Sequence, residues 1–167
     1  MNLTEIPNGE RVLLDSNILI YAASGDSRQC VNLFERCRNE TIQGYITTVT
    51  VAECCHRWMM LEAVRNGFIP SSNPARALSS KPAVVKNLSD YATRVHGLIG
   101  GTLQVRSIEA MDFVAALHLQ KQWGVLTNDS LQLAVAERLG IKAIASADAG
   151  FDSVQGLIVY KPSDLTI

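Results

Sequence analysis

The apolar residues of this sequence fall in two alternating patterns. Five short apolar runs have the length of buried strands, and they lie at residues 11–15, 44–47, 103–106, 142–145 and 157–160. Between them are longer segments with an apolar residue at every third or fourth position, the period of an amphipathic helix. Strands that alternate with helices favour a mostly parallel sheet with helices on both faces, so we expect an α/β fold.

Six helices are expected, one starting near residue 17 and the others at 28–38, 51–66, 83–98, 109–123 and 130–139. The clearest has a continuous apolar stripe, formed by Val51, Cys54, Cys55, Trp58 and Met59. The helix at 109–123 has an apolar face of its own, formed by Ala110, Phe113, Val114 and Leu117. Such faces are typical of helices that pack on a core.

Residues 67–82 interrupt this pattern. They hold three of the five prolines and four serines, which favours a long loop with at most one helical turn. Neither flanking part has a complete core alone, so we interpret the segment as an insertion within one domain that spans residues 1–167. A chain of this length can bury the core of a single domain.

Composition and charge exclude several classes of protein. With 47% hydrophobic and 19% charged residues, the chain is neither disordered nor fibrous. No apolar run approaches the roughly 20 residues that span a bilayer, and no secretory signal is recognisable, so we expect a cytoplasmic protein without a membrane partner. Because 15 basic residues face 16 acidic ones and the net charge is −1, any RNA must be held by local basic residues and bound metal.

The four cysteines, Cys30, Cys37, Cys54 and Cys55, have no paired CxxC spacing. A zinc site needs ligands at short, defined spacings, and disulfides are not expected in a cytosolic chain. We therefore expect ordinary core residues. No glycine-rich nucleotide-binding loop is present either.

Four acidic residues lie where a sheet of this kind binds ligands. Asp15 closes the first strand and Asp148 follows the fourth, while Glu53 and Asp129 fall in the expected first turns of two helices. Ligands of open parallel sheets bind beyond the carboxyl ends of the strands, so all four carboxylates could meet at one edge. Carboxylate oxygens are ligands of Mg²⁺ and Mn²⁺. Such a metal would assist phosphodiester hydrolysis, since it lowers the pKa of an attacking water and stabilises charge on the phosphate.

Each acid also has an ordinary structural interpretation. Glu53 could complete a capping box with Thr50 or pair with Arg57. The other three could cap helices or lie in turns. Spacing alone leaves metal binding and these roles evenly balanced.

Four segments resemble, in order, the motifs of the PIN-domain family, and together they cover nearly the whole chain. They are LLDSNILIYA at 13–22, VTVAE at 49–53, NDSLQLAVAERLGI at 128–141 and IASADAGFDSVQGLIVY at 144–160. The resemblance implies a five-stranded sheet of order 3-2-1-4-5 in an α/β/α sandwich, and a metal-dependent endoribonuclease similar to VapC toxins. The positions matching the family's acids, which bind one or two Mg²⁺ or Mn²⁺, are Asp15, Glu53, Asp129 and Asp148. Ser16, Asn17 and Ser146 match positions that support the acids by hydrogen bonding.

The resemblance also implies partners. Many small prokaryotic members are toxins held inactive by an antitoxin that inserts into the cleft, and they commonly dimerise, so we expect an RNA substrate, a VapB-like antitoxin and a homodimer. Two features depart from the family. Gly150 stands where many relatives have Asp, which leaves Asp152 as a possible further ligand or a surface residue. Residues 67–82 also make the chain longer than a typical small toxin.

Two other functions stay open. The chain could be a PIN nuclease in housekeeping RNA processing, or a PIN-fold module that binds RNA or protein without cutting. The basic side chains that could contact RNA around the cleft are Arg57, Arg65, Arg76, Lys81 and Lys86, although solvated surface positions would explain them equally well.

Overall fold

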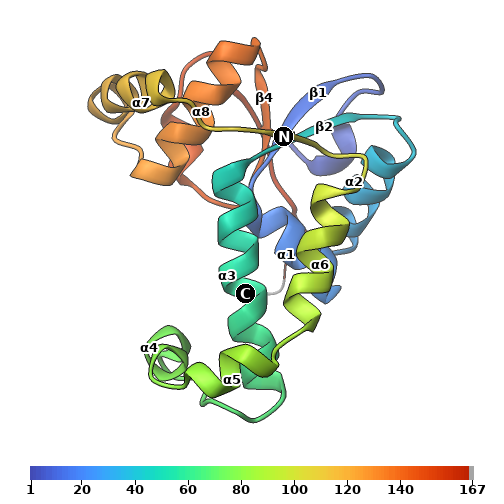
Figure 1. The fold of residues 1–167 in the computed structure, drawn as a ribbon. Coiled ribbons are helices and arrows are strands. Elements are labelled where there is room, and N and C mark those ends of the chain that lie inside the picture. Colours follow the sequence, from blue (N-terminus) through green and yellow to red (C-terminus); the bar gives the residue numbers. More distant parts are fainter. Residues whose placement is uncertain (166–167) are drawn as a thin grey trace.

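The computed structural model describes residues 1–165 and has a layered α/β/α arrangement (Figure 1). Five strands form one sheet of order β3-β2-β1-β4-β5, in which neighbouring strands pair in parallel. The strands are β1 (Arg11–Leu14), β2 (Gln43–Thr47), β3 (Gln104–Arg106), β4 (Ala143–Ala145) and β5 (Ile158–Tyr160). The fold class and the strand order expected from the sequence are therefore confirmed.

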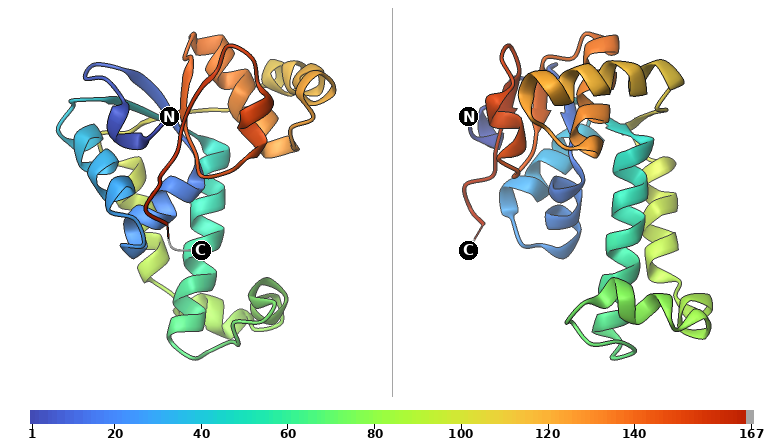
Figure 2. Two further views of the ribbon diagram at one scale, coloured as in Figure 1. Left: turned by 180° about the vertical axis from the view of Figure 1, so that it is seen from behind. Right: turned by 90° about the vertical axis from the view of Figure 1, so that its left-hand side faces the viewer.

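Helices connect the strands and cover both faces of the sheet (Figure 2). They are α1 (Ser16–Ser24), α2 (Arg28–Arg38), α3 (Thr48–Arg65), α4 (Pro74–Ser79), α5 (Pro82–Asn87), α6 (Asp90–Ile99), α7 (Ala110–Trp123) and α8 (Thr127–Leu139), with short 3-10 helices at Leu3–Glu5 and Gly150–Ser153. Within residues 1–165, no helix is long and apolar enough to cross a membrane.

Alternate strand side chains enter two cores, one on each face of the sheet. Val12 and Leu14 of β1 lie in a core shared with α1, α2, α3 and α6, whereas Leu13 lies in the core shared with α7 and α8. Successive side chains of a strand point to opposite faces. Burial on both faces explains why β1 appears in the sequence as a continuous apolar run.

Close packing fixes one residue of β2. A Cβ atom at Gly44 would lie 2.5 Å from Cδ2 of Leu103 and 2.8 Å from Sγ of Cys37, so no larger side chain fits without displacing its neighbours. Cys37 is buried there with Cys30 and Cys54. These three cysteines are core residues, as expected.

The segment after α3 differs from the prediction. The expected loop at 67–82 contains the six-residue helix α4, and the expected long helix at 83–98 is divided into α5 and α6. At the division, Leu88 has an extended backbone with φ −78° and ψ 138°. Leu88 packs with Ala63, Ile69 and Leu78 in a small third core. Burial against α3, which periodicity does not reveal, explains both differences.

We refer to residues 67–88, which include α4 and α5, as the arm. The arm extends from the far end of α3, at the bottom of Figure 1.

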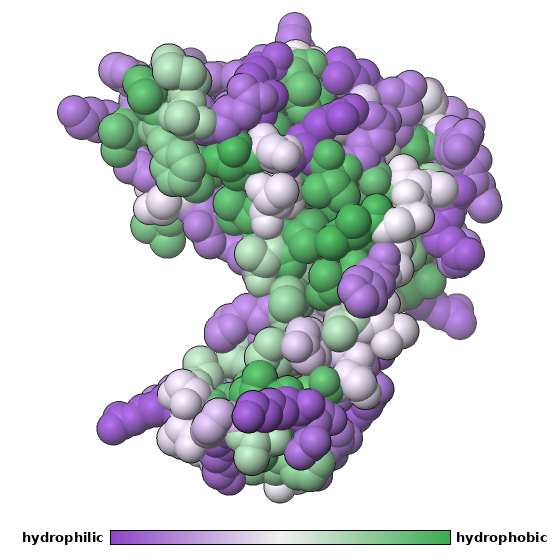
Figure 3. Space-filling model, in the orientation of Figure 1, coloured by the Kyte–Doolittle hydropathy of each residue, from purple (hydrophilic) through white to green (hydrophobic). Residues whose placement is uncertain are grey.

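The apolar face predicted for α7 is exposed and does not pack on the core. Phe113, Val114 and Leu117 are 54%, 48% and 60% exposed, and apolar atoms cover α7 at the upper left of Figure 3. The side of α7 that faces α8 instead carries the buried residues Ala116 and Leu119 and a polar contact, in which the buried carboxylate of Asp112 accepts hydrogen bonds from Nε and Nη2 of Arg138, both at 2.8 Å.

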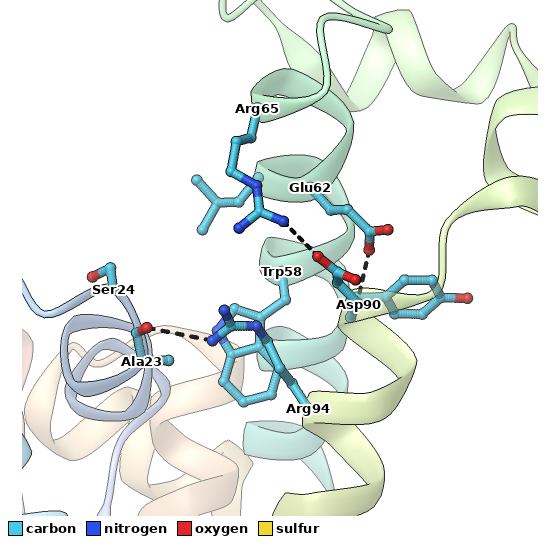
Figure 4. Close-up of a pocket in the computed structure, with 9 residues that line it drawn as sticks. Ala23, Ser24, Trp58, Glu62, Arg65, Asp90 and Arg94 are labelled. Atoms are coloured by element: carbon cyan, nitrogen blue, oxygen red, sulfur yellow. Dashed lines mark hydrogen bonds and ion pairs between the residues drawn. The ribbon is translucent and has the colours of Figure 1, made fainter.

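Glu62, near the end of α3, holds the start of α6 (Figure 4). Its side chain is buried, and its carboxylate accepts hydrogen bonds from the backbone N–H groups of Ser89 at 2.9 Å and Tyr91 at 2.8 Å. Burial would raise the pKa of Glu62, but these backbone donors outweigh burial and lower the pKa. One helix thus supplies the N-terminal cap of another.

We predict that Glu62→Gln lowers the free energy of unfolding by about 1–3 kcal/mol at neutral pH, because it removes a buried, charged acceptor from two backbone donors. A lowered pKa gives stability above the unfolded pKa that is lost as the pH falls through the folded value, so the difference should shrink near about pH 3. Urea unfolding measures both. Arg65→Gln is the control, since its ion pair with Asp90 is exposed on both sides and contributes at most about 1 kcal/mol. An equal loss in the two variants would contradict the capping role.

Candidate active site

The sheet places two of the predicted acids side by side. β1 and β4 are parallel neighbours at its centre. Asp15 follows β1 and is the N-cap residue of α1, and Asp148 lies three residues beyond β4. Because both strands end at the same edge, this edge is where a ligand of the sheet would bind.

Helices bring the other two acids to this edge. Asp129 lies in the first turn of α8, as expected. Glu53 lies in the second turn of α3, because α3 begins at Thr48 and its capping box is formed by Thr47 and Thr50. The predicted box of Thr50 with Glu53 was therefore wrong. Buried polar threonines concealed the true start of the helix.

Asp15 is held by four hydrogen bonds and is only 5% exposed. Oδ1 accepts from the backbone N–H of Ser16 at 2.7 Å and from Nε2 of Gln132 at 3.2 Å. Oδ2 accepts from Nδ2 of Asn17 at 2.6 Å and from Oγ of Ser146 at 2.7 Å. A buried carboxylate needs such donors, and they fix its orientation in the site.

Asn17 and Ser146 also fix the loop that carries Asp148. Oδ1 of Asn17 accepts from the backbone N–H of Ala147 at 3.0 Å, and Oγ of Ser146 accepts from that of Asp148 at 3.0 Å. Both side chains therefore lie where a supporting role requires them. Ser16 contributes its backbone N–H to Asp15.

The pKa of Asp129 responds to the other three acids. Burial, followed by the negative charges of Asp15, Asp148 and Glu53, raises the pKa of Asp129 to about 6. Each of the other three acids contributes to this shift. An excess of negative charge is therefore concentrated at this edge.

Gly150 leaves room for this arrangement. A Cβ atom at Gly150 would lie 3.3 Å from Oδ2 of Asp129 and 3.7 Å from Oδ1 of Asp148, and its backbone N–H donates to Oδ1 of Asp148 at 3.0 Å. Asp152, the possible further ligand, forms an ion pair with Lys161 at 2.6 Å. Asp152 therefore already has a positively charged partner within the protein.

Two residues of α8 that the sequence analysis did not identify contact the acids. Gln132 is fully buried and donates to Asp15, while its Oε1 atom has no hydrogen-bond partner in the part of the chain that is described. Asn128 donates from Nδ2 to Oε1 of Glu53 at 2.5 Å. The available signal was position, since both are near neighbours of Asp129 on one helix.

The donor set fits a hard divalent cation, because carboxylate oxygens are the ligands that Mg²⁺ and Mn²⁺ prefer. As they stand, however, no three His, Cys, Asp or Glu side chains among residues 1–165 form a group that could hold a metal ion. The carboxylates would have to draw closer around a cation. Asp148 is exposed and Glu53 and Asp129 are half-buried, so burial does not prevent these three side chains from rotating toward Asp15.

A pocket of about 260 Å³ opens beside Glu53, and it is lined by Ser16, Asn17, Ile20, Tyr21, Glu53, His56 and Arg57. Arg57 thus lies next to Glu53. Of the other residues expected to contact RNA, Arg76, Lys81 and Lys86 lie on the arm and Arg65 lies at its base, and none of them lines this pocket.

The raised pKa of Asp129 predicts that replacing this acid stabilises the folded, metal-free chain. Because the folded pKa lies above the unfolded one, stability from the neutral carboxyl is present below the unfolded pKa and lost as the pH rises through about 6. Asp129→Asn should therefore raise the free energy of unfolding of the metal-free chain at about pH 7.5 by up to about 3 kcal/mol, with little effect near about pH 4. Urea unfolding in EDTA measures this. Asp152→Asn, which removes an acid already paired, should give no gain, and a gain in both variants would contradict the explanation.

Comparisons with known proteins agree on the fold. No protein-family model and no curated protein matches the sequence. Among solved structures, VapBC2 of Rickettsia felis bound to a DNA fragment from its promoter has a chain 17% identical to this one, with a TM-score of 0.54 over 92% of this chain and 99% of that chain. A toxin–antitoxin complex from Klebsiella pneumoniae matches at 18% identity, with a TM-score of 0.53 over 88% and 95%. FitAcB of Neisseria gonorrhoeae matches at 16%, with a TM-score of 0.51 over 89% and 96%.

At these identities the likeness concerns the arrangement of the backbone. It extends over nearly the full length of each matched chain. The chain therefore has a PIN-like α/β/α fold, shared with chains of VapBC and FitAB complexes.

Proposed function

We propose that this chain is a Mg²⁺- or Mn²⁺-dependent endoribonuclease that acts in the cytoplasm as the toxin of a type II toxin–antitoxin pair. The nuclease proposal is supported by four carboxylates at the central carboxyl edge of the sheet, where burial and the other three acids raise the pKa of Asp129. The likeness to chains from toxin–antitoxin complexes supports the proposed role as a toxin.

The side chains divide the work of this site. A divalent cation held by Asp15, Glu53, Asp129 and Asp148 would activate a water and stabilise negative charge on the phosphate. Asp15 supplies a carboxylate that its hydrogen bonds keep in one orientation. Asn17 and Ser146 fix the position of the loop after β4, and Asn128 orients Glu53.

Cleavage of RNA in Mn²⁺ tests the nuclease. We expect activity that EDTA removes and that Asp15→Asn or Asp129→Asn lowers by more than about 100-fold, since loss of a ligand should exceed the roughly 10–100-fold effects of residues behind the ligands. Asp152→Asn is the matched control, because it removes the same charge from the segment after β4, where Asp152 is paired with Lys161. Equal cleavage in every condition would contradict the proposal. Tight Mn²⁺ binding without any cleavage would instead indicate the non-cutting module.

This chain has an apolar groove that is suited to an antitoxin segment. An apolar groove of about 620 Å³ lies between α1, α2 and α6, and its lining includes Leu19, Phe34, Trp58, Gly97 and Leu98. Trp58 and Arg94 also line the pocket of Figure 4, so the groove continues toward α3. We infer that an apolar segment of the antitoxin occupies this groove. The homodimer stays a prediction, and the exposed apolar face of α7 is where a second copy could bury most apolar surface.

Gly97→Leu tests the groove without disturbing the fold. A Cβ atom there meets nothing within 4 Å, and leucine is favoured over glycine in a helix by about 1 kcal/mol, so α6 should be slightly stabilised while the groove is filled. We expect expression of the wild type to arrest growth and the product of a neighbouring small gene to relieve it, with relief lost for Gly97→Leu and kept for His96→Leu on the same helix. Equal relief in both variants would exclude this groove. Absence of arrest would favour a housekeeping nuclease.

A further inference from the structure

Basic side chains are concentrated in one part of the chain. Between Glu62 and Glu109 lie six of the 15 arginines and lysines and one of the 16 acids, Asp90. This part therefore has an excess of five positive charges in a chain whose net charge is −1. The acids of the site and the basic residues of this part are thus segregated.

Three of these basic residues lie on the arm. Arg76, Lys81 and Lys86 are exposed, and within residues 1–165 none of them forms an ion pair. The arm contains no acid of its own. By contrast, Arg65 at its base pairs with Asp90. Basic side chains that are grouped without acidic partners are suited to binding the phosphates of a nucleic-acid backbone.

Polar side chains surround Arg76. Arg76 borders a shallow hollow of about 500 Å³, lined by Ser72, Asn73, Ala77, Ser79 and Ser80. Hydroxyl and amide groups beside a guanidinium are suited to phosphate and ribose oxygens.

The arm lies on the side of α3 that faces the site. Glu53, Arg57, Met60 and Val64 follow one another at helical spacing and share one face of α3. Met60 and Val64 pack against the core of the arm, and Met60 is only about 10 Å along the helix from Glu53. Figure 3 shows the surface hollowed between the arm and the part of the molecule that carries α7 and α8.

We propose, on the basis of the nuclease function above, that the arm binds the phosphate backbone of the RNA beside the cleavage site. Arg57 contacts the backbone near the acids, and Arg76, Lys81 and Lys86 contact it further along α3. RNA that reaches the arm binds more tightly than RNA that fills only the acidic site. The arm thereby supplies the local positive charge that the chain as a whole lacks.

A double variant tests the arm. The variant Arg76→Gln/Lys86→Gln is compared with Arg28→Gln/Lys142→Gln. The control also removes one arginine and one lysine, both at exposed positions outside the arm, and Lys142 lies at the amino end of β4. Binding of a labelled single-stranded RNA of about 20 nucleotides is measured over a series of salt concentrations, in an Asp129→Asn background that prevents cleavage. The slope of log affinity against log salt should fall by about 1.4 for the arm variant, at roughly 0.7 per phosphate contact, and stay unchanged for the control.

Kinetics on the active chain give a second readout. The KM for the long RNA should rise severalfold in the arm variant while kcat stays unchanged, because the arm does not touch the reacting phosphate. Thermal unfolding confirms that both double variants are folded.

Equal salt slopes for the arm variant and the control would overturn the inference, even if the chain cuts RNA. A reduced slope in a chain that cuts no RNA would support the arm and remove the nuclease. If the arm variant keeps its RNA slope but loses binding to polyglutamate, the arm is a surface for an acidic protein and the RNA inference fails.

Discussion

The buried carboxylate of Asp15 is the point on which the site depends. It ends the central strand β1, caps α1, and accepts hydrogen bonds from α1, α8 and the residue that follows β4. An ionised group at 5% exposure is tolerated only with such donors. The same bonds therefore keep the charge buried and hold three segments, distant in the sequence, around one edge of the sheet.

This arrangement has an electrostatic cost, which is visible at Asp129. Its pKa of about 6 reflects burial and three neighbouring carboxylates, so the fold keeps a charge distribution that destabilises the metal-free chain. Active sites commonly retain such strain because function requires it. The close approach of Gly150 to two of the acids shows how little space surrounds them.

Helix α3 links the acidic edge to the basic arm. Glu53 lies near its start, Trp58 borders the apolar groove, and Glu62 caps α6 near its end. One helix therefore carries residues of the metal site and the antitoxin groove that we propose, and it packs against the proposed RNA-binding arm. A change in the position of α3 would affect all three, whereas α7 is attached to the other face of the sheet.

The sequence by itself determined the strands, their parallel order through family resemblance, and the positions of the four acids, because buried strands and terminal carboxylates leave local patterns. It could not give the true start of α3, where buried threonines replace apolar residues, or the outward face of α7, where Asp112 takes the buried side. Gln132 and the fold of the arm were likewise decided by contacts between distant segments. Burial of a polar group is favourable only when a partner from elsewhere in the chain reaches it, and that is a property of tertiary structure.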